Sequence, residues 1–265
     1  MATIWLGRSY NRWMIDLAEI RALEERGFNA WPSRRTIVCC GWLLRVSDGY
    51  TKRANSANAL QPDGAFAEVR KAAEELYARH GLPAVFRLSP LAPPEVDREL
   101  DAAGYALFDP SLVLVAPLPA AHGIADVEIE HSPSAAWLGG FAAANGIAAG
   151  QRPIHDLMVS SIAMPAAFAT LWVDGRPIGF GLAVYERGAI GLFDIVIAPA
   201  ERGRGNGRAL TGALIQWGRS AGARTAYLQV REQNAGARRL YAALGFREAY
   251  RYHYRVPNTV LAERR

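Results

Sequence analysis

The stretch from Leu192 to Arg208, which reads LFDIVIAPAERGRGNGR, decides how the rest of the chain is interpreted. It begins as a β-rich run that ends at Ala198-Pro199, and it passes through a glycine-rich turn into a helical pattern from about residue 206. The glycines let the backbone turn tightly and let its amide groups approach a ligand closely. The start of the helix adds unpaired N–H groups and a partial positive charge. We therefore predict a strand, a turn and a helix N-terminus that together bind an anion such as a pyrophosphate.

The positive charge of the chain gathers near this stretch. Through residue 120 the chain has 14 basic residues (lysine or arginine) and 14 acidic residues (aspartate or glutamate). After residue 120 it has 16 basic and 11 acidic residues. Arg202, Arg204 and Arg208 are interleaved with the glycines. A basic segment of this kind serves either nucleic acid or one compact polyanion such as a phosphorylated cofactor. The place of the three arginines favours the cofactor, and because no groove-reading motif accompanies them we do not expect nucleic acid as a partner.

Two common phosphate-binding motifs do not fit the turn. The dinucleotide fingerprint fails because Arg208 stands where its last glycine belongs, and the P-loop fails because no Gly-Lys-Ser/Thr follows. What fits is Arg/Gln-x-x-Gly-x-Gly/Ala, filled by Arg202, Gly205 and Gly207. Further along, residues 230–246 read VREQNAGARRLYAALGF. With these two motifs the chain resembles the GNAT superfamily of acetyl-CoA-dependent N-acetyltransferases, over residues 168–256.

The resemblance implies how a co-substrate binds. In this family acetyl-CoA lies against a strand that separates from its neighbour, a turn that holds the pyrophosphate, and an asparagine that starts the next helix. The matching positions here are Ile195, Val196, Ile197, Arg202, Gly203, Arg204, Gly205, Asn206, Gly207, Arg208 and Asn234. Acetyl-CoA is therefore the expected co-substrate. The five histidines show no ligand spacing, so we expect no metal.

Two residues are expected to take part in the chemistry. By resemblance, Tyr241 would protonate the departing thiolate, and a backbone amide near Val196 would polarise the thioester carbonyl. Asp194, near the expected acetyl position, would bind the acceptor amine or act as a base through water; the alternative is a structural hydrogen-bond acceptor. In relatives that acetylate the N-termini of ribosomal proteins a glutamate stands at the position of Gln229, and glutamine cannot accept a proton usefully. That difference argues against this subgroup.

The order of predicted elements indicates a duplicated fold. At an offset of 141 residues, Gly81 matches Gly222, and Gly104-Tyr105 matches Gly245-Phe246. We predict a mixed α/β (α+β) fold of two GNAT-like units, each a mostly antiparallel sheet flanked by helices. The unit at 1–120 is accessory, and the unit at 121–265 is catalytic and carries the acetyl-CoA site. The segment 117–124, rich in proline and small residues, is the predicted linker.

The first unit lacks the cofactor-binding residues of the second. The sequence QPDGAF at 61–66 stands where residues 202–207 stand, and Pro93 and Leu100 replace the asparagine and the tyrosine. We interpret this unit as a degenerate copy that does not bind acetyl-CoA. Residues 36–46 and 50–60, joined at Ser47–Gly49, are expected to form a hairpin, which resembles a segment of bacterial GNAT proteins with an extra domain. Arg53 and Asn55, at alternating positions of it, would line the acceptor site, or else belong to an ordinary exposed face.

The sequence thus favours an N-acetyltransferase acting on a primary amine of a small molecule or a protein. The alternative is a non-catalytic acyl-CoA-binding regulatory protein, against which the presence of Tyr241 beside an intact loop argues. With 265 residues, 51% of them hydrophobic, the chain has no apolar run long enough to span a membrane and no signal-peptide pattern at its start. We expect a cytoplasmic protein without membrane partners. The sequence leaves a homodimer open.

Overall fold

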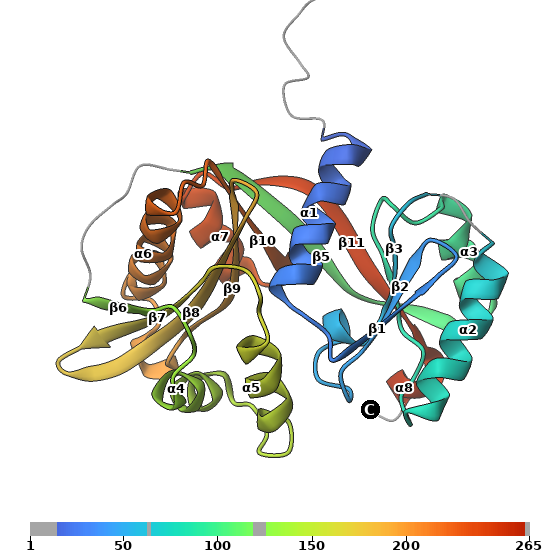
Figure 1. Ribbon diagram of the computed structural model, residues 1–265, viewed down its shortest axis with the longest axis horizontal. Helices are drawn as coiled ribbons and strands as arrows, with labels where there is room; N and C mark the ends of the chain where they lie inside the picture. Colours follow the sequence, from blue (N-terminus) through green and yellow to red (C-terminus); the bar gives the residue numbers. More distant parts are fainter. Residues whose placement is uncertain (1–14, 63–64, 119–125, 263–265) are drawn as a thin grey trace, which may run out of the picture.

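The computed structural model describes residues 15–62, 65–118 and 126–262, which form one mixed sheet with helices packed on it (Figure 1). The strands, in chain order, are β1 (Arg35–Cys39), β2 (Trp42–Val46), β3 (Ala57–Ala59), β4 (Phe86–Leu88), β5 (Tyr105–Pro117), β6 (Val127–Glu130), β7 (Ala166–Val173), β8 (Arg176–Glu186), β9 (Ala189–Ile197), β10 (Thr225–Arg231) and β11 (Arg247–Pro257). The helices are α1 (Leu17–Ala30), α2 (Phe66–Arg79), α3 (Pro94–Ala102), α4 (Ala135–Asn145), α5 (Arg152–Ser160), α6 (Asn206–Ser220), α7 (Ala235–Ala243) and α8 (Asn258–Ala262), with 3-10 turns η1 (Lys52–Ala54) and η2 (Pro199–Glu201). The predicted mixed α/β class is confirmed.

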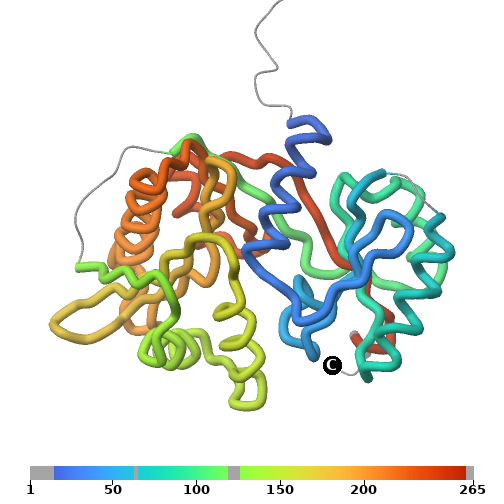
Figure 2. The backbone as a smooth tube through the Cα atoms, viewed as in Figure 1, coloured from blue at the N-terminus to red at the C-terminus, as the bar shows by residue number. Residues whose placement is uncertain are grey.

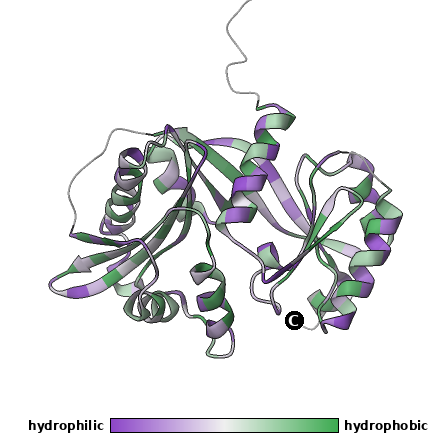
Figure 3. Ribbon diagram, in the orientation of Figure 1, coloured by the Kyte–Doolittle hydropathy of each residue, from purple (hydrophilic) through white to green (hydrophobic). Residues whose placement is uncertain are grey.

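The strands lie in the order β1-β2-β3-β4-β11-β5-β10-β9-β8-β7-β6. Neighbours run antiparallel except at β3–β4 and β9–β10, which are parallel. In the C-terminal half, α6 and α4 both contact β7, β8 and β9. The two helices pack into different apolar clusters: Leu210 and Leu214 of α6 belong to one, and Trp137 and Phe141 of α4 belong to the other. The two helices therefore cover opposite faces of the sheet. Figure 3 shows apolar residues along much of β7, β8 and β9, whereas the helices carry both apolar and polar residues.

Two long strands are exchanged between the halves of the chain. β5 comes from the first half, yet it pairs with β10 of the second half through the register Tyr227↔Val115. β11 comes from the second half, yet it pairs with β4 of the first half through Tyr254↔Arg87. β5 and β11 also pair with each other, and Figure 2 shows both crossing the middle of the molecule. The sheet is thus continuous across the predicted boundary at residue 120. Of the predicted linker 117–124, Pro117 ends β5 and residues 119–124 lie outside the described residues.

The hairpin of the first half is placed differently from the prediction. β1 and β2 pair with each other and turn at Cys40-Gly41, where φ is +43° and +77°. Ser47–Gly49 instead follows β2, and the chain then forms η1 and the short β3. Arg53 and Asn55 therefore lie in and after a 3-10 turn, so the prediction that they alternate along a strand was wrong.

The predicted repeat recurs in the order of elements. In each half a helix, a strand, a second helix and a long strand follow one another, as α2-β4-α3-β5 and as α6-β10-α7-β11. The helical spacing of Ile15, Leu17, Ile20 and Leu23 predicts a helix that stops at Gly27, whereas α1 continues to Ala30. The sequence pattern indicates no strand between the linker and Phe168, so it misses β6. In residues 15–62, 65–118 and 126–262 no helix combines the length and the apolarity that crossing a membrane requires.

Candidate active site

A β-bulge in β9 sets the position of Asp194. The register of β8 and β9 shifts between Phe180 and Leu182, so that Asp194 and Ile195 together lie opposite Gly181. Asp194 has a φ of +50°, a conformation that aspartate adopts more readily than most residues. Such a bulge bends a strand and turns one side chain in a new direction.

The bulge coincides with the separation of β9 from β10. The two strands pair from Thr225↔Ala189 to Leu228↔Leu192 and not beyond. The predicted separation is therefore confirmed, and the β10-facing backbone of residues 193–197 is left open. A cavity of about 260 Å³ lies in the gap. Its charged and polar lining includes Arg53, Ser111, Asp194, Gln229, Tyr241 and Tyr252.

The glycine-rich turn exposes consecutive backbone donors. No backbone or side-chain acceptor within the described chain bonds the amides of Gly203, Arg204, Gly205, Asn206 and Gly207. Gly203 and Gly205 have φ of +78° and +83°, and no atom lies within 4 Å of a Cβ built on either. Gly205 also begins α6 without a side-chain cap. The turn therefore has the free donors and the helix end that an anion site requires.

The polar side chains of the turn have separate tasks. Arg202 Nε donates to the carbonyl that ends β9, at 2.9 Å, and so ties the turn to the strand. Asn206 Nδ2 donates to the carbonyl of Glu201 at 3.0 Å, and Arg204 forms an ion pair with the Glu201 carboxylate at 3.0 Å. Arg208 is exposed on the first turn of α6. Thus Arg204 and Arg208 are accessible to a bound anion, and Arg202 has a structural bond of its own.

Asn234 and Tyr241 both line the cavity, as the second motif predicts. Asn234 caps α7, because its side-chain oxygen accepts from the amide of Ala237 at 3.1 Å. Tyr241 is 8% exposed and packs edge-on against Phe246, with ring centroids 5.8 Å apart. Burial raises the pKa of Tyr241 to about 12. The phenol is therefore protonated at neutral pH and can donate.

A buried histidine, which the sequence did not single out, bridges two carboxylates beside the cavity. His155 Nε2 lies 3.2 Å from Asp194 Oδ2, and its Nδ1 lies 3.0 Å from Asp156 Oδ1. The ring is fully buried and stacks on Phe141 at 4.8 Å between centroids. Burial lowers the pKa of His155, but the hydrogen bonds and charges of Asp194 and Asp156 outweigh it, so the pKa lies above its usual 6.5. No spacing motif could have revealed this contact, because His155 and Asp194 are 39 residues apart.

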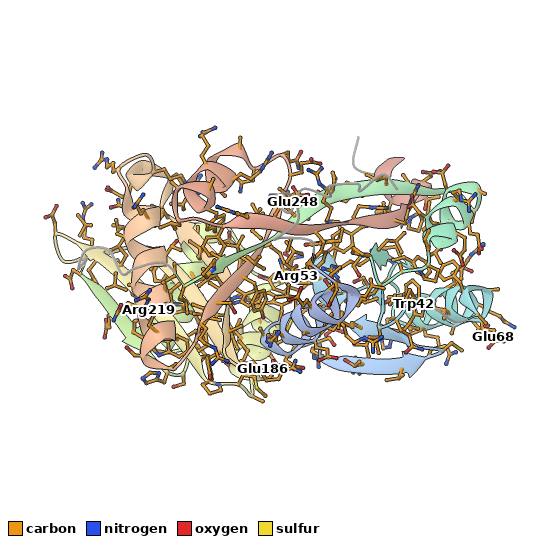
Figure 4. All side chains as sticks on the ribbon, turned by 90° about the horizontal axis from the view of Figure 1, so that it is seen from above. Trp42, Arg53, Glu68, Glu186, Arg219 and Glu248 are labelled. Atoms are coloured by element: carbon orange, nitrogen blue, oxygen red, sulfur yellow. The ribbon has the colours of Figure 1, made fainter. Side chains whose placement is uncertain are left out.

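Arg53 reaches the same cavity from the first half, and Figure 4 places it in the middle of the molecule. Its guanidinium carbon lies 5.7 Å from the ring centroid of Trp31 and 5.8 Å from that of Phe193. Asn55 does not line the cavity; its buried side chain binds the backbone of residues 47–51. Of the pair predicted at the acceptor site, the structure thus brings only Arg53 there.

The exchanged strands add two more residues that the sequence did not suggest. Ser111 of β5 and Tyr252 of β11 line the cavity. The Tyr252 hydroxyl donates to Gln229 Oε1 at 3.1 Å, which orients the amide of Gln229.

Across the part of the chain that the structure describes, no three His, Cys, Asp or Glu side chains are grouped as a metal would require.

Known proteins of similar sequence cover nearly the whole chain. Residues 17–255 match the family described as "Probable histone acetyltransferase Rv0428c C-terminal". The chain is 28% identical over 246 residues to "Uncharacterized N-acetyltransferase YobR" of Bacillus subtilis, a match that covers 90% of this chain and 98% of that protein. It is 41% identical over 71 residues to the ribosomal protein bS18-alanine N-acetyltransferase of Haemophilus influenzae, which is 27% of this chain and 48% of that enzyme.

Solved structures show the same fold. A GCN5-related N-acetyltransferase from Kribbella flavida superposes with a TM-score of 0.68 at 19% identity, over 89% of this chain and 95% of that one. A tandem GNAT protein from the clavulanic acid biosynthesis pathway gives a TM-score of 0.56 at 14% identity, over 76% and 74% of the two chains. At these identities the likeness concerns the fold.

Proposed function

Because the chain belongs to the Rv0428c C-terminal acetyltransferase family, within the GNAT superfamily of N-acetyltransferases, we propose that acetyl-CoA is its acyl donor and a primary amine its acceptor. The single observation that carries this proposal is the run of five free amides in the turn that follows β9, the strand whose residues 192–195 line the cavity. A diphosphate at these amides would point its pantetheine arm along residues 195–197. The thioester would then lie near Asp194 and Tyr241.

Acyl transfer needs a neutral amine, a polarised carbonyl and a protonated leaving group. The amine nitrogen attacks the thioester carbon, the C–S bond breaks, and the thiolate leaves. We assign polarisation of the carbonyl oxygen to the open β9 backbone near Val196, because this edge has no strand partner. An unperturbed amine of lysine type is neutral in only about one molecule in 10³ at pH 7, so its proton must be removed by the site.

Tyr241 is the proposed proton donor to the thiolate. With its pKa at about 12, transfer to a thiolate of pKa about 8.5 is uphill by about 5 kcal/mol, more than an unperturbed tyrosine would require. Burial, which raises the pKa of the phenol, also raises the pKa of a buried thiol. The difference between the pKa values of the phenol and the thiol therefore becomes smaller when the thiolate forms inside the cavity. The phenol can then act as the acid.

Asp194 is the proposed binding group for the amine. Its Oδ2 is bonded to His155, and its other oxygen is free to accept a hydrogen bond from an ammonium in the cavity. The proton of the ammonium would leave to Asp194 or to water. His155 does not line the cavity, so its role is to orient the carboxylate.

The test is calorimetry with CoA followed by an acetyl-transfer screen of amines and peptides that measures thiol release. We expect saturable CoA binding and thiol release that depends on an amine. Absence of CoA binding would contradict the proposal. Binding without any product would instead support the alternative, a non-catalytic acyl-CoA-binding protein, which the family does not favour.

A further inference from the structure

One of the cations that line the cavity, Arg53, forms no ion pair with any described residue. In the described residues no carboxylate lies within 4 Å of the Arg53 guanidinium, and the buried Arg53 Nε has no hydrogen-bond partner. Buried polar groups of folded proteins are almost always paired. The preceding residue shows the contrast, because Lys52 pairs with Asp109 at 2.8 Å and lines a different cavity.

We propose that the acceptor is a zwitterion, an amine that also carries an anionic group, with its amine at Asp194 and its anion at Arg53. This inference rests on the proposed function, because it takes the cavity between β9 and β10 as the place of acyl transfer. It names the substrate class, and it assigns a task to the first half of the chain.

Arg53 lies beside β9, away from the turn at which the phosphates of the cofactor are expected. The turn at 203–207 follows the end of β9, whereas Arg53 packs on Phe193, four residues before that end at Ile197. Because of the bulge, Phe193 and Ile197 lie opposite Leu182 and Gly179 of β8, so at about 3.3 Å per residue they are about 10 Å apart. Asp194 lies between them. Arg53 therefore stands beyond the expected acetyl group, on the side from which an acceptor must approach.

The backbone around Arg53 is fixed before any ligand binds. Arg45 is 1% exposed, and its Nη1 donates to the carbonyl of Arg53 at 3.0 Å. Asn55 is 6% exposed, and its amide nitrogen donates to the carbonyls of Tyr50 and Thr51, each at 2.8 Å. Thr51 has a φ of +55°, a conformation that is rare and costly for a β-branched residue. Strain and buried polar groups of this kind gather where a protein holds a binding group in one place.

A guanidinium held this way recognises planar or tetrahedral anions. Its donors form a fork that matches a carboxylate or a phosphate with two parallel hydrogen bonds. Trp31 and Phe193, which stack on each other, both contact the guanidinium and limit its directions. Because the side chain is already ordered, little rotamer entropy is lost on binding.

The experiment compares matched acceptors with and without the anion, with kcat/KM calculated for the neutral amine because the anion also changes the pKa of that amine. L-alanine, β-alanine and 4-aminobutyrate are assayed beside their amides, and 2-aminoethyl phosphate beside ethanolamine. For the wild type we expect kcat/KM about 10- to 100-fold higher with the matching anionic acceptor, the size of a charged hydrogen-bond pair. The carboxylate and phosphate arms tell the two anions apart.

Variants then assign the preference to Arg53. Arg53→Met should remove this preference, because it lowers kcat/KM for the anionic acceptors about 10- to 100-fold more than for the uncharged amines, and the calorimetric affinity for CoA should stay unchanged. Arg53→Lys should restore part of the preference. Lys52→Met is the matched control, because it removes a charge from the same turn but outside the cavity, and it should keep the wild-type preference.

The outcomes separate this inference from the proposed function. If the wild type does not bind CoA, the proposed function itself is rejected. If amines are acetylated but the anion makes no difference, or if Arg53→Met lowers both classes equally, the zwitterion is rejected. If no acceptor of the panel is acetylated, binding of an anionic amine to the CoA-loaded protein is measured by calorimetry. Saturable binding to the wild type that is absent in Arg53→Met supports the inference. Absence of binding to the wild type overturns it.

Discussion

At the scale of single residues, the backbone conformation of Asp194 connects three features of the site. Its φ of +50° produces the bulge, the bulge coincides with the end of pairing to β10, and the carboxylate is directed toward both His155 and the cavity. An acidic residue in a pattern of β-formers is visible in the sequence. The bulge is not visible there, because it depends on the register with β8, a pairing between strands.

Tyr241→Phe tests the proton donor. We expect kcat to fall at least about 10-fold, because general-acid catalysis typically contributes more than this factor. The calorimetric affinity for CoA should stay within about twofold, because the ring that packs on Phe246 is kept. Tyr185→Phe, on β8 and outside the cavity lining, serves as control. Unchanged turnover in Tyr241→Phe would remove the acid role.

Asp194→Asn tests the contact with His155. Since Asp194 supplies the strongest interactions that raise the pKa of His155, we expect this pKa to fall in the variant, measured by NMR titration of the imidazole. Asp174→Asn, in an exposed turn, is the control. An unchanged titration would show that the contact does not exist in solution.

The same contact predicts the pH dependence of stability. Folding raises the pKa of His155, so the protonated histidine stabilises the folded state. This contribution is fully present at a pH below the pKa of the unfolded state, about 6.5, and it is lost as the pH rises through the pKa of the folded state. We therefore expect the wild type to lose unfolding free energy over this range relative to Asp194→Asn. Urea unfolding at several pH values measures the difference, and parallel curves would contradict it.

At the scale of elements, the sequence predicts best where a motif and a period agree. The helices α6 and α7 with the turn before α6 were placed within a residue or two, because the glycines, the helical spacing and the Asn-capped start all point the same way. The hairpin was misplaced because Ser47-Asp48-Gly49 is a stronger turn signal than Cys40-Gly41. β6 was missed because its pattern lasts only four residues.

Gly205→Val tests the anion-binding turn. With φ at +83°, a β-branched residue must change the backbone and so redirect the amides, although space for the side chain exists. We expect CoA affinity to fall at least about 10-fold, measured by calorimetry. Gly146→Val, at the end of α4 with φ of +67° and equally open space, carries a similar strain away from the turn. Equal loss of affinity in both would contradict the assignment.

At the scale of the whole molecule, the exchange of β5 and β11 makes the halves interdependent. β10 and β11 do not pair with each other; each pairs with β5 from the first half. The cavity accordingly takes Arg53, Ser111 and Tyr252 from outside the segment that holds the two motifs. No local pattern could predict this, since the pairing depends on contacts more than a hundred residues apart.

Expression of residues 121–265 alone tests this interdependence. Without β4 and β5, β11 loses both of its neighbouring strands and β10 loses one, so we expect no cooperative thermal unfolding and no calorimetric binding of CoA. Co-expression with residues 1–120 is the control, because the pairing does not require a continuous chain, and it should restore both. Independent folding of the C-terminal piece would show that the exchange is dispensable.

The late synthesis of β11 has a consequence for how the protein is made. β4 is translated well before the strand that covers it, through Arg87 and Tyr254, because residues 89–246 lie between β4 and β11. Until then the nascent first half carries an uncovered sheet edge, which is a site for wrong pairing between chains. Contacts so distant along the chain also slow folding. Production of this enzyme should therefore depend on chaperones that guard unfinished chains more than that of a GNAT protein whose strands stay within one unit.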